Sequence, residues 1–158
     1  MREIQLVQGH VALVDDEDYE SISAYKWYAN IITRVDGSFS VYVQRNMKKP
    51  RSLHRFIMDA PADMEVDHIN GNPLDNRRTN LRICSRSENM QNQRHQTGGT
   101  SKFKGVYWSK HTRKWRAQIS INWKKKHLGL FETEQEAALA YNVAALELHG
   151  EFARINVL

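Results

Sequence analysis

The chain has 158 residues, 41% hydrophobic and 26% charged, and these values exclude a wholly disordered chain and a fibrous repeat. A mean hydropathy of -0.66 without a long uncharged apolar run predicts no transmembrane helix, and the single Cys84 excludes an intramolecular disulfide and a cysteine-rich zinc site. The excess of 23 Lys and Arg over 18 Asp and Glu, a net charge of +5, suits a polyanionic partner.

The first 61 residues carry short alternating runs that predict strands and two runs with helical spacing. In chain order we expect a strand, a turn and a strand over 3–14, a helix over 15–25, a hairpin of 31–35 and 39–43 around Asp36-Gly37, and a short helix over 51–59 that Pro61 ends. The N-terminus lacks the apolar core of a signal peptide, so we expect a cytoplasmic protein.

Residues 65–93 concentrate the side chains that can do chemistry. The stretch 65–72 begins as a strand and breaks into an Asn/Gly loop, and 80–84 predicts a second short strand. Ser85 and Glu88 have the spacing of a capping box, which opens a helix that carries Asn89. This order of elements can bring the pair Asp67 and His68 opposite the first turn of that helix.

Such a set of side chains suits the hydrolysis of a phosphodiester with a divalent cation. Asp67 and Asn89 offer the oxygen ligands that Mg²⁺ prefers. His68, with an ordinary pKa of about 6.5, is largely neutral at pH 7 and can accept a proton from water. Arg82 and Arg86 are candidate phosphate contacts.

A second interpretation of the same residues stays open. Asp67-His68 followed by Asn70-Gly71-Asn72 also fits turn chemistry, in which His68 bonds a carbonyl and the asparagines close Asx turns.

The last 57 residues show clearer periodicity. We expect strands over 104–109, 114–122 and 125–130, the last two joined by a tight connection at Asn122-Trp123. Thr133 and Glu136 have the spacing of a capping box, and the helix that follows ends at Gly150.

Charge is distributed unevenly along the chain. Residues 1–93 carry a net charge of -1, whereas residues 94–158 carry +6. The stretch 102–126 has nine basic residues, no acidic residue and interleaved aromatic residues, a combination typical of a nucleic-acid surface. A solvated sheet face with lysines for solubility is the alternative. The small-residue run 97–101 is the expected linker between two folding units.

Several strings carry a resemblance over about residues 53–93: Glu65–Asn72, Leu74–Arg77, Thr79–Arg82 and Ser87–Asn89. They resemble the HNH endonuclease family, in the subgroup common in phage and homing nucleases. The resemblance implies a ββα-metal fold with His68 and Asn80 as catalytic residues, His68 as the general base and Asn80 as a brace of the loop. It also implies that Asp67 and Asn89 bind the metal. Because Asn89 stands in place of a histidine, the expected metal is Mg²⁺ or Mn²⁺ in preference to Zn²⁺. His54 either belongs to this motif or packs beneath it.

The C-terminal part resembles the plant-type Apetala/ethylene-response-factor (AP2/ERF) DNA-binding domain. The strings that carry this resemblance are Lys104–Trp108, Trp115–Ala117, His127–Phe131, Glu136–Tyr141 and Phe152–Asn156. It implies a three-stranded antiparallel sheet, backed by one helix, that lies in the major groove. The residues that it places on the DNA face are Lys104, Tyr107, Ser109, Lys110, Arg116, Gln118, Ser120, Lys125 and His127.

Departures from the plant pattern limit what can be carried over. Tyr107, Ser109 and Ser120 stand where plant factors have arginine, so the plant target sequence is not implied. Trp115 is expected in the core in preference to a DNA contact, and Tyr141 is expected to pack in preference to reaching a phosphate.

We therefore expect an α+β protein. A β-rich region (1–50) leads into an HNH nuclease module (51–96), and a linker (97–101) joins it to an AP2/ERF-type DNA-binding domain (102–158). The expected function is a homing-type, metal-dependent endonuclease that nicks or cleaves double-stranded DNA, as a monomer or weak dimer, in the cytoplasm of a bacterial or phage-infected cell. A non-catalytic DNA-binding regulator with a relic nuclease motif is the alternative, and an RNA-binding module fits the charge equally well.

Overall fold

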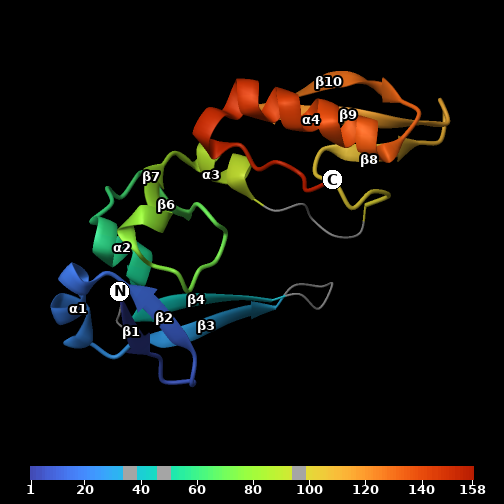
Figure 1. Ribbon diagram of the computed structural model, residues 1–158. Coiled ribbons are helices and arrows are strands. Elements are labelled where there is room, and N and C mark those ends of the chain that lie inside the picture. Colours follow the sequence, from blue (N-terminus) through green and yellow to red (C-terminus); the bar gives the residue numbers. More distant parts are fainter. Residues whose placement is uncertain (34–38, 46–50, 94–98) are drawn as a thin grey trace. The chain divides into compact units, whose positions relative to one another are not determined.

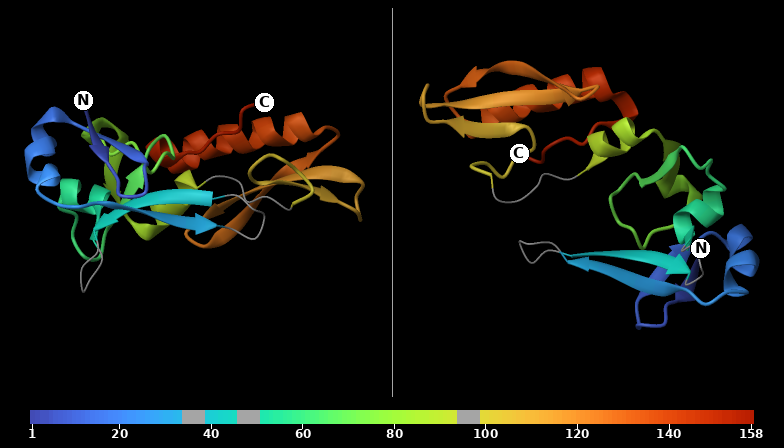
Figure 2. Two further views of the ribbon diagram at one scale, coloured as in Figure 1. Left: turned by 90° about the horizontal axis from the view of Figure 1, so that it is seen from below. Right: turned by 180° about the vertical axis from the view of Figure 1, so that it is seen from behind.

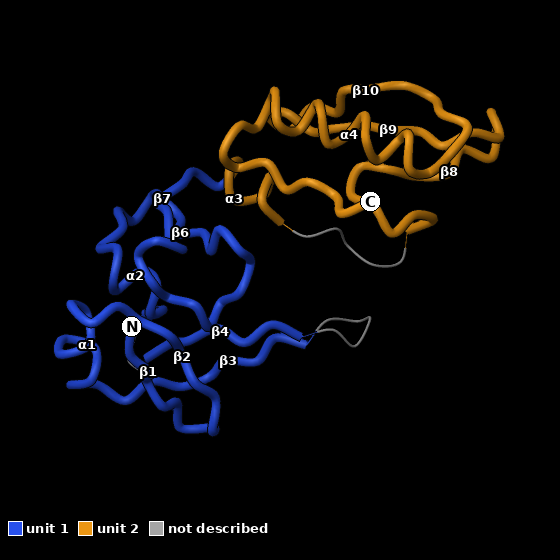
Figure 3. The backbone as a smooth tube through the Cα atoms, in the orientation of Figure 1, with its two compact units in different colours: residues 1–86 blue, residues 87–158 orange. Residues whose placement is uncertain are grey.

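The computed structural model describes residues 1–33, 39–45, 51–93 and 99–158. Contacts divide the chain into two units, Met1–Arg86 and Ser87–Leu158 (Figure 3). Both units combine helices with small antiparallel sheets, which confirms the α+β class expected from the sequence (Figure 1). Among the described helices, none is long and apolar enough to cross a membrane.

The described residues of the first unit form three antiparallel sheets and two α-helices. Its elements are β1 (Arg2–Gln5), β2 (Val11–Val14), α1 (Asp16–Ser23), β3 (Tyr28–Thr33), β4 (Phe39–Arg45), β5 (Arg51–Ser52), α2 (Leu53–Met58), β6 (Glu65–His68), the 3₁₀ turn η1 (Arg78–Asn80) and β7 (Leu81–Cys84). The sheets are β1-β2, β3-β4-β5 and β6-β7. The turn expected at Asp36-Gly37 lies outside the described residues.

The start of the second helix differs from the expectation. Helical structure was expected from Arg51, but Arg51 and Ser52 are extended and pair with Arg45 and Gln44 of β4. Because Arg51 and Ser52 are held in this strand pairing, the helix begins at Leu53. It ends at Met58, and the next residue, Asp59, adopts a left-handed conformation with φ 43°.

One hydrophobic core joins the N-terminal strands to the stretch that carries the HNH-like strings. Trp27 and Val43 from the first 50 residues are buried with Leu53, Val66 and Leu81. Each Å² of apolar surface that is buried stabilises a fold by about 25 cal/mol, so this shared core is the main source of stability for both segments. Residues 1–33 and 39–45 thus help to hold the candidate site in place.

Polar contacts attach the loop between β6 and β7 to the N-terminal segment. Leu13 forms a backbone bridge to Asp75, and its N–H donates to Leu74 O at 2.8 Å. The Arg78 guanidinium donates to both carboxylate oxygens of Asp18 at 2.8 and 2.7 Å, and its backbone N–H donates to Asp15 Oδ2 at 2.7 Å. The loop that carries the candidate site is therefore fixed at both its middle and its end.

The second unit is a three-stranded sheet backed by a long helix. Its elements are α3 (Arg86–Asn92, whose first residue ends the first unit), β8 (Val106–Ser109), β9 (Lys114–Ile121), β10 (Lys124–Phe131), α4 (Glu134–His149) and the 3₁₀ turn η2 (Gly150–Phe152). The antiparallel strand order is β10-β9-β8, and α4 covers one face of the sheet (Figure 2). The expected capping box at Thr133 and Glu136 is confirmed.

Gly105, just before β8, occupies a position that excludes a side chain. Its φ is +76°, and a Cβ there would overlap the ring of Tyr141 and lie 2.5 Å from Gln118 O. We expect Gly105→Ala to destabilise the protein by about 2–4 kcal/mol, because overpacking adds to the cost of a left-handed alanine.

Urea denaturation followed by circular dichroism measures this effect. Gly9→Ala is the matched control, because Gly9 has nearly the same positive φ (+79°) but nothing within 4 Å of its Cβ position. Equal losses of unfolding free energy in the two variants would show that the overlap with Tyr141 adds nothing to the cost of Gly105→Ala.

Candidate active site and nucleic-acid interface

The two strands of the β6-β7 hairpin place Asp67 directly opposite Arg82. Arg82 donates from Nε and Nη2 to Asp67 Oδ2 at 3.1 and 2.8 Å. The side chains are only 12% and 9% exposed, so this is a largely buried ion pair. A buried pair depends on both partners, since removal of one leaves the other charge without compensation.

His68 ends β6, and a buried asparagine fixes its orientation. Asn76 Nδ2 donates to Pro73 O at 3.0 Å, which turns Asn76 Oδ1 toward His68 Nε2 at 3.3 Å. Because that oxygen can only accept, Nε2 carries the proton of the neutral ring, and Nδ1 is its basic nitrogen. Burial lowers the pKa of His68, although the Asn76 hydrogen bond and the nearby Asp67 and Asp75 charges act in the opposite direction.

A second histidine lies against this ring. His54, on α2, has its ring centroid 5.1 Å from that of His68, with the two planes at 77°. His54 Nε2 also forms a 3.2 Å hydrogen bond with Ser52 Oγ. Burial, and then the charges of His68 and Arg55, lower the pKa of His54 to about 3. Both rings are therefore neutral at pH 7, and His54 packs directly on His68.

Asparagines organise the backbone of the loop between the two strands. Asn80 Nδ2 donates to Asp75 O at 2.8 Å, and Asn80 Oδ1 accepts from the Asn70 N–H at 3.0 Å. Asn70 and Asn72 accept from backbone N–H groups two residues further on, as Asx turns require. The turn interpretation thus holds for Asn70 and Asn72, while His68, at the end of β6, and Asn80, at the end of η1, are buried on either side of them.

The remaining candidate residues lie around α3. Asn89 is partly buried on this helix, in the second unit, and Arg86 is the exposed last residue of the first unit. Within the described residues, no group of three or more His, Cys, Asp and Glu side chains gathers into a metal-binding cluster. Carboxylate and amide oxygens, as in Asp67 and Asn89, nevertheless match the donor preference of a hard divalent cation whose other positions are filled by water and phosphate.

Sequence reasoning missed Asn76 and the partners of Arg78. Asn76 is fully buried, and nothing in its sequence context distinguishes it from the other loop asparagines. Its role depends on Pro73 and His68 approaching it from both sides. Arg78 and Asp18 are 60 residues apart, so their ion pair carries no local signal.

Strand alternation gathers the predicted DNA contacts on one face of the β8-β9-β10 sheet. Ala117 and Ile119 on β9 are buried in clusters that include residues of α4, so the residues that alternate with them face away from α4. Cross-strand pairs share a face, and the pairs on this outer face are Tyr107 with Arg116, His127 with Gln118, Lys125 with Ser120, and Ser109 with Lys114. The outer face thus carries seven of the nine predicted residues.

Side chains on this outer face contact one another across the strands. Arg116 Nε donates to His127 Nδ1 at 3.1 Å, and the Arg116 guanidinium lies 5.7 Å from the Tyr107 ring centroid. Tyr107 Oη donates to Gln118 Oε1 at 3.3 Å. These contacts hold polar side chains in an array across the centre of the sheet.

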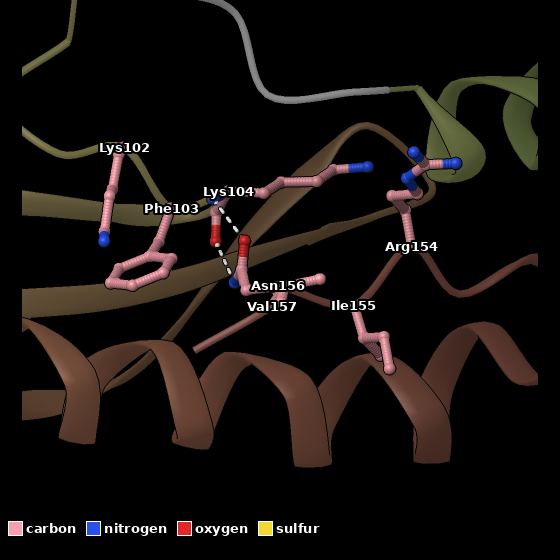
Figure 4. Close-up of a pocket in the computed structure, with 7 residues that line it drawn as sticks. All are labelled: Lys102, Phe103, Lys104, Arg154, Ile155, Asn156 and Val157. Atoms are coloured by element: carbon pink, nitrogen blue, oxygen red, sulfur yellow. Dashed lines mark hydrogen bonds between the residues drawn. The ribbon is translucent and has the colours of Figure 1, made fainter. Parts of the chain in front are cut away.

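The other two predicted residues flank β8. Lys110 is exposed in the turn after it, whereas Lys104 precedes it and borders a cavity of about 240 Å³ with Lys102 and Arg154 (Figure 4). Lys104 Nζ donates to the backbone oxygens of Gln91 and Gln93. Burial and the charge of Arg154 lower the pKa of Lys104 to about 8.

Trp115 and Tyr141, the two aromatic residues for which a DNA contact was the alternative, both pack within the second unit. Trp115 contacts the core cluster around Phe103 and forms an edge-to-face pair with Trp108, with centroids 5.3 Å apart. Tyr141 is 2% exposed in the core between α4 and β9.

Comparisons with known proteins find similarity in both parts of the chain. A family model described as HNH endonuclease matches residues 59–91. The chain is 32% identical over 155 residues to "Uncharacterized HNH endonuclease L560" of Acanthamoeba polyphaga mimivirus, which covers 94% of this chain and 76% of that protein. It is 35% identical over 94 residues to "Protein 3.8" of Escherichia phage T7, covering 60% of this chain and 77% of that protein.

A third similarity concerns a transcription factor. An AP2-like ethylene-responsive transcription factor of Arabidopsis thaliana is 41% identical over 54 residues, which cover 33% of this chain and 16% of that protein. This partial match supports an AP2/ERF-like DNA-binding region next to the nuclease-like one.

Proposed function

The chain belongs to the HNH endonuclease family, and from that premise we propose that it is a homing-type enzyme that nicks or cleaves duplex DNA by hydrolysing phosphodiester bonds. The observation that carries the proposal is the state of His68. The ring is buried and neutral, Asn76 orients it with Nδ1 as its basic nitrogen, and it is adjacent to Asp67 in the chain.

His68 is the general base in this proposal. A neutral imidazole can take a proton from the attacking water at Nδ1 as the new P–O bond forms, and the leaving oxygen of the DNA strand departs from phosphorus. Asn76 keeps the ring in the required tautomer, and Asn80 holds the backbone of the loop between β6 and β7. Both asparagines are therefore positioning residues.

Asp67 and Asn89 would hold the divalent metal, which we take to be Mg²⁺ with Mn²⁺ as the alternative. When bound, the metal supplies electrostatic stabilisation of charge on the phosphate and on the leaving oxygen. Arg82 and Arg86 would bind phosphate oxygens through charge-assisted hydrogen bonds.

The proposal assigns DNA binding to the AP2/ERF-type domain (102–158), joined through the linker (97–101) to the nuclease module (51–96), which the region 1–50 supports. The outer face of the sheet, with Arg116, Gln118, Lys125 and His127, would contact the major groove, with Lys104 and Lys110 beside it. One HNH site in each chain suits cleavage of one strand per binding event, so a double-strand cut requires a second copy. The similarity to a phage protein supports action in a bacterial or phage-infected cell.

A plasmid-relaxation assay tests this function. Supercoiled DNA should be converted to the nicked circle with Mg²⁺ or Mn²⁺ and should stay supercoiled with EDTA. Binding without cleavage under any of these conditions would instead identify a non-catalytic DNA-binding regulator. Preferential binding of RNA in competition at fixed salt would overturn the assignment of DNA as the partner.

A further inference from the structure

Trp123 occupies an unusual place at the end of the β9-β10 hairpin. Asn122 and Trp123 form a two-residue connection, and both have positive φ angles, 47° and 66°. Two positive φ values define a type I′ turn, in which glycine is strongly preferred at the second position. A bulky residue there is a conformational outlier.

Packing within the chain does not compensate for this backbone. Trp123 is 68% exposed, whereas Trp27 is 1% exposed in the first unit. A tryptophan that occupies a glycine-favoured position and leaves most of its surface in water stabilises the fold little. The strained backbone and the exposed indole therefore point to a contact between Trp123 and another molecule.

The surroundings of the indole are basic, and Lys125 among the neighbouring lysines lies on the outer face of the sheet, opposite Ser120. Lys124, Lys125 and Lys126 follow it directly, and all three are exposed. Trp123 also borders a cavity of about 380 Å³, whose lining combines the basic Lys104 and Lys125 with the apolar Met90 and Ile119. No Asp or Glu is among the described residues that line this cavity. A polyanion drawn to the lysines would thus meet the indole.

We propose that Trp123 is a DNA-contacting residue, whose indole packs on a sugar or base of the bound strand next to a phosphate that Lys125, on the outer face of the sheet, neutralises. The inference rests on the proposed DNA-binding function and extends its surface to the hairpin end. Aromatic side chains contact the faces of nucleic-acid bases with little regard to sequence. Trp123 thus contributes affinity, while the side chains on the outer face of the sheet contribute specificity.

Trp123→Gly separates this role from a structural one, because the two predict opposite changes. A glycine directly after Asn122 would give this turn its preferred sequence, so the melting temperature should hold or rise, by up to about 5 °C. Affinity for a fluorescein-labelled duplex of mixed sequence, measured by anisotropy in EDTA, should fall by about 5- to 100-fold. Unchanged affinity, or a loss accompanied by a lower melting temperature, would overturn the proposal.

The salt dependence of binding gives a second readout. Since an indole releases no counterion, Trp123→Gly should leave the slope of log K against log[salt] unchanged. Lys125→Ala should make the slope shallower by about one. A shallower slope for Trp123→Gly would show that the loss comes from displaced lysines, and it would contradict direct contact.

Two further variants serve as controls. Trp123→Phe keeps an aromatic ring and should lose less affinity than Trp123→Gly. Leu146→Ser removes a 57% exposed apolar side chain from α4, which covers the opposite side of the sheet, and it should bind DNA as the unaltered chain does. A loss in Leu146→Ser equal to that in Trp123→Gly would rule out a specific role for the indole.

The form of the DNA distinguishes the contacted group. If the indole packs on a sugar, Trp123→Gly should weaken binding equally to a duplex and to one with a short unpaired bubble. If it stacks on a base, the loss should be larger with the bubble. An unaltered chain that binds neither DNA would refute the proposed function itself, whereas normal binding by Trp123→Gly refutes only the role of Trp123.

Discussion

Replacing His68 by alanine is expected to lower metal-dependent DNA cleavage by about 10²- to 10⁴-fold while leaving DNA affinity unchanged. The loss follows from removal of the group that accepts a proton at Nδ1. Affinity is spared because the proposed DNA contacts, in the domain of residues 102–158 and at Arg82 and Arg86, do not include His68. Single-turnover relaxation of a supercoiled plasmid in Mg²⁺ measures the rate, and anisotropy in EDTA measures binding.

His10→Ala is the matched control, since His10 is partly buried in the turn between β1 and β2 and has no proposed catalytic role. The cleavage rate of Asn76→Ala should lie between those of His68→Ala and His10→Ala, because His68 remains but its tautomer is no longer fixed. Cleavage by His68→Ala at the rate of the unaltered chain would remove His68 from the role of base. Melting curves of all three variants confirm that rate differences do not come from unfolding.

The parts of the fold that local periodicity determines were predictable from the sequence. Alternation along residues 106–131 anticipates the three strands, whereas the side chains on their outer face were expected from the resemblance to AP2/ERF domains, and the pairing of the strands places seven of them there. The capping box at Thr133 works over only three residues, so its signal is local. Even here the register shift between His127 and Gly129, which accommodates Leu128, has no clear sequence signature.

The contacts that organise the candidate site were not predictable, since they join segments distant in sequence. Arg82 faces Asp67 only because β6 and β7 pair in one register, and a shift by one residue would turn the two side chains apart. Asn76 reaches His68 only because the backbone of the loop is bonded to Leu13. The core shared by Trp27 and Leu53 likewise ties the N-terminal segment to the site in a way that no motif reports.

The second large effect is expected at Asp67, where Asp67→Ala should abolish Mg²⁺-dependent cleavage and also lower stability. Removal of the carboxylate takes away one side of this largely buried ion pair with Arg82, at a cost of about 3–5 kcal/mol. Loss of activity in this variant alone would therefore have two explanations, a missing metal ligand or a distorted site.

The double variant Asp67→Ala, Arg82→Met separates them. With both charges gone the buried position becomes apolar, so most of the stability lost in Asp67→Ala should return in urea denaturation. Cleavage should not return. Because Arg82 is itself a proposed phosphate contact, the deciding measurement is the binding of Mn²⁺, followed by electron paramagnetic resonance, which should stay weak because the ligand is still absent. Recovery of cleavage together with stability would show that Asp67 acts only as the ion-pair partner of Arg82. Asp67 would then not be a metal ligand.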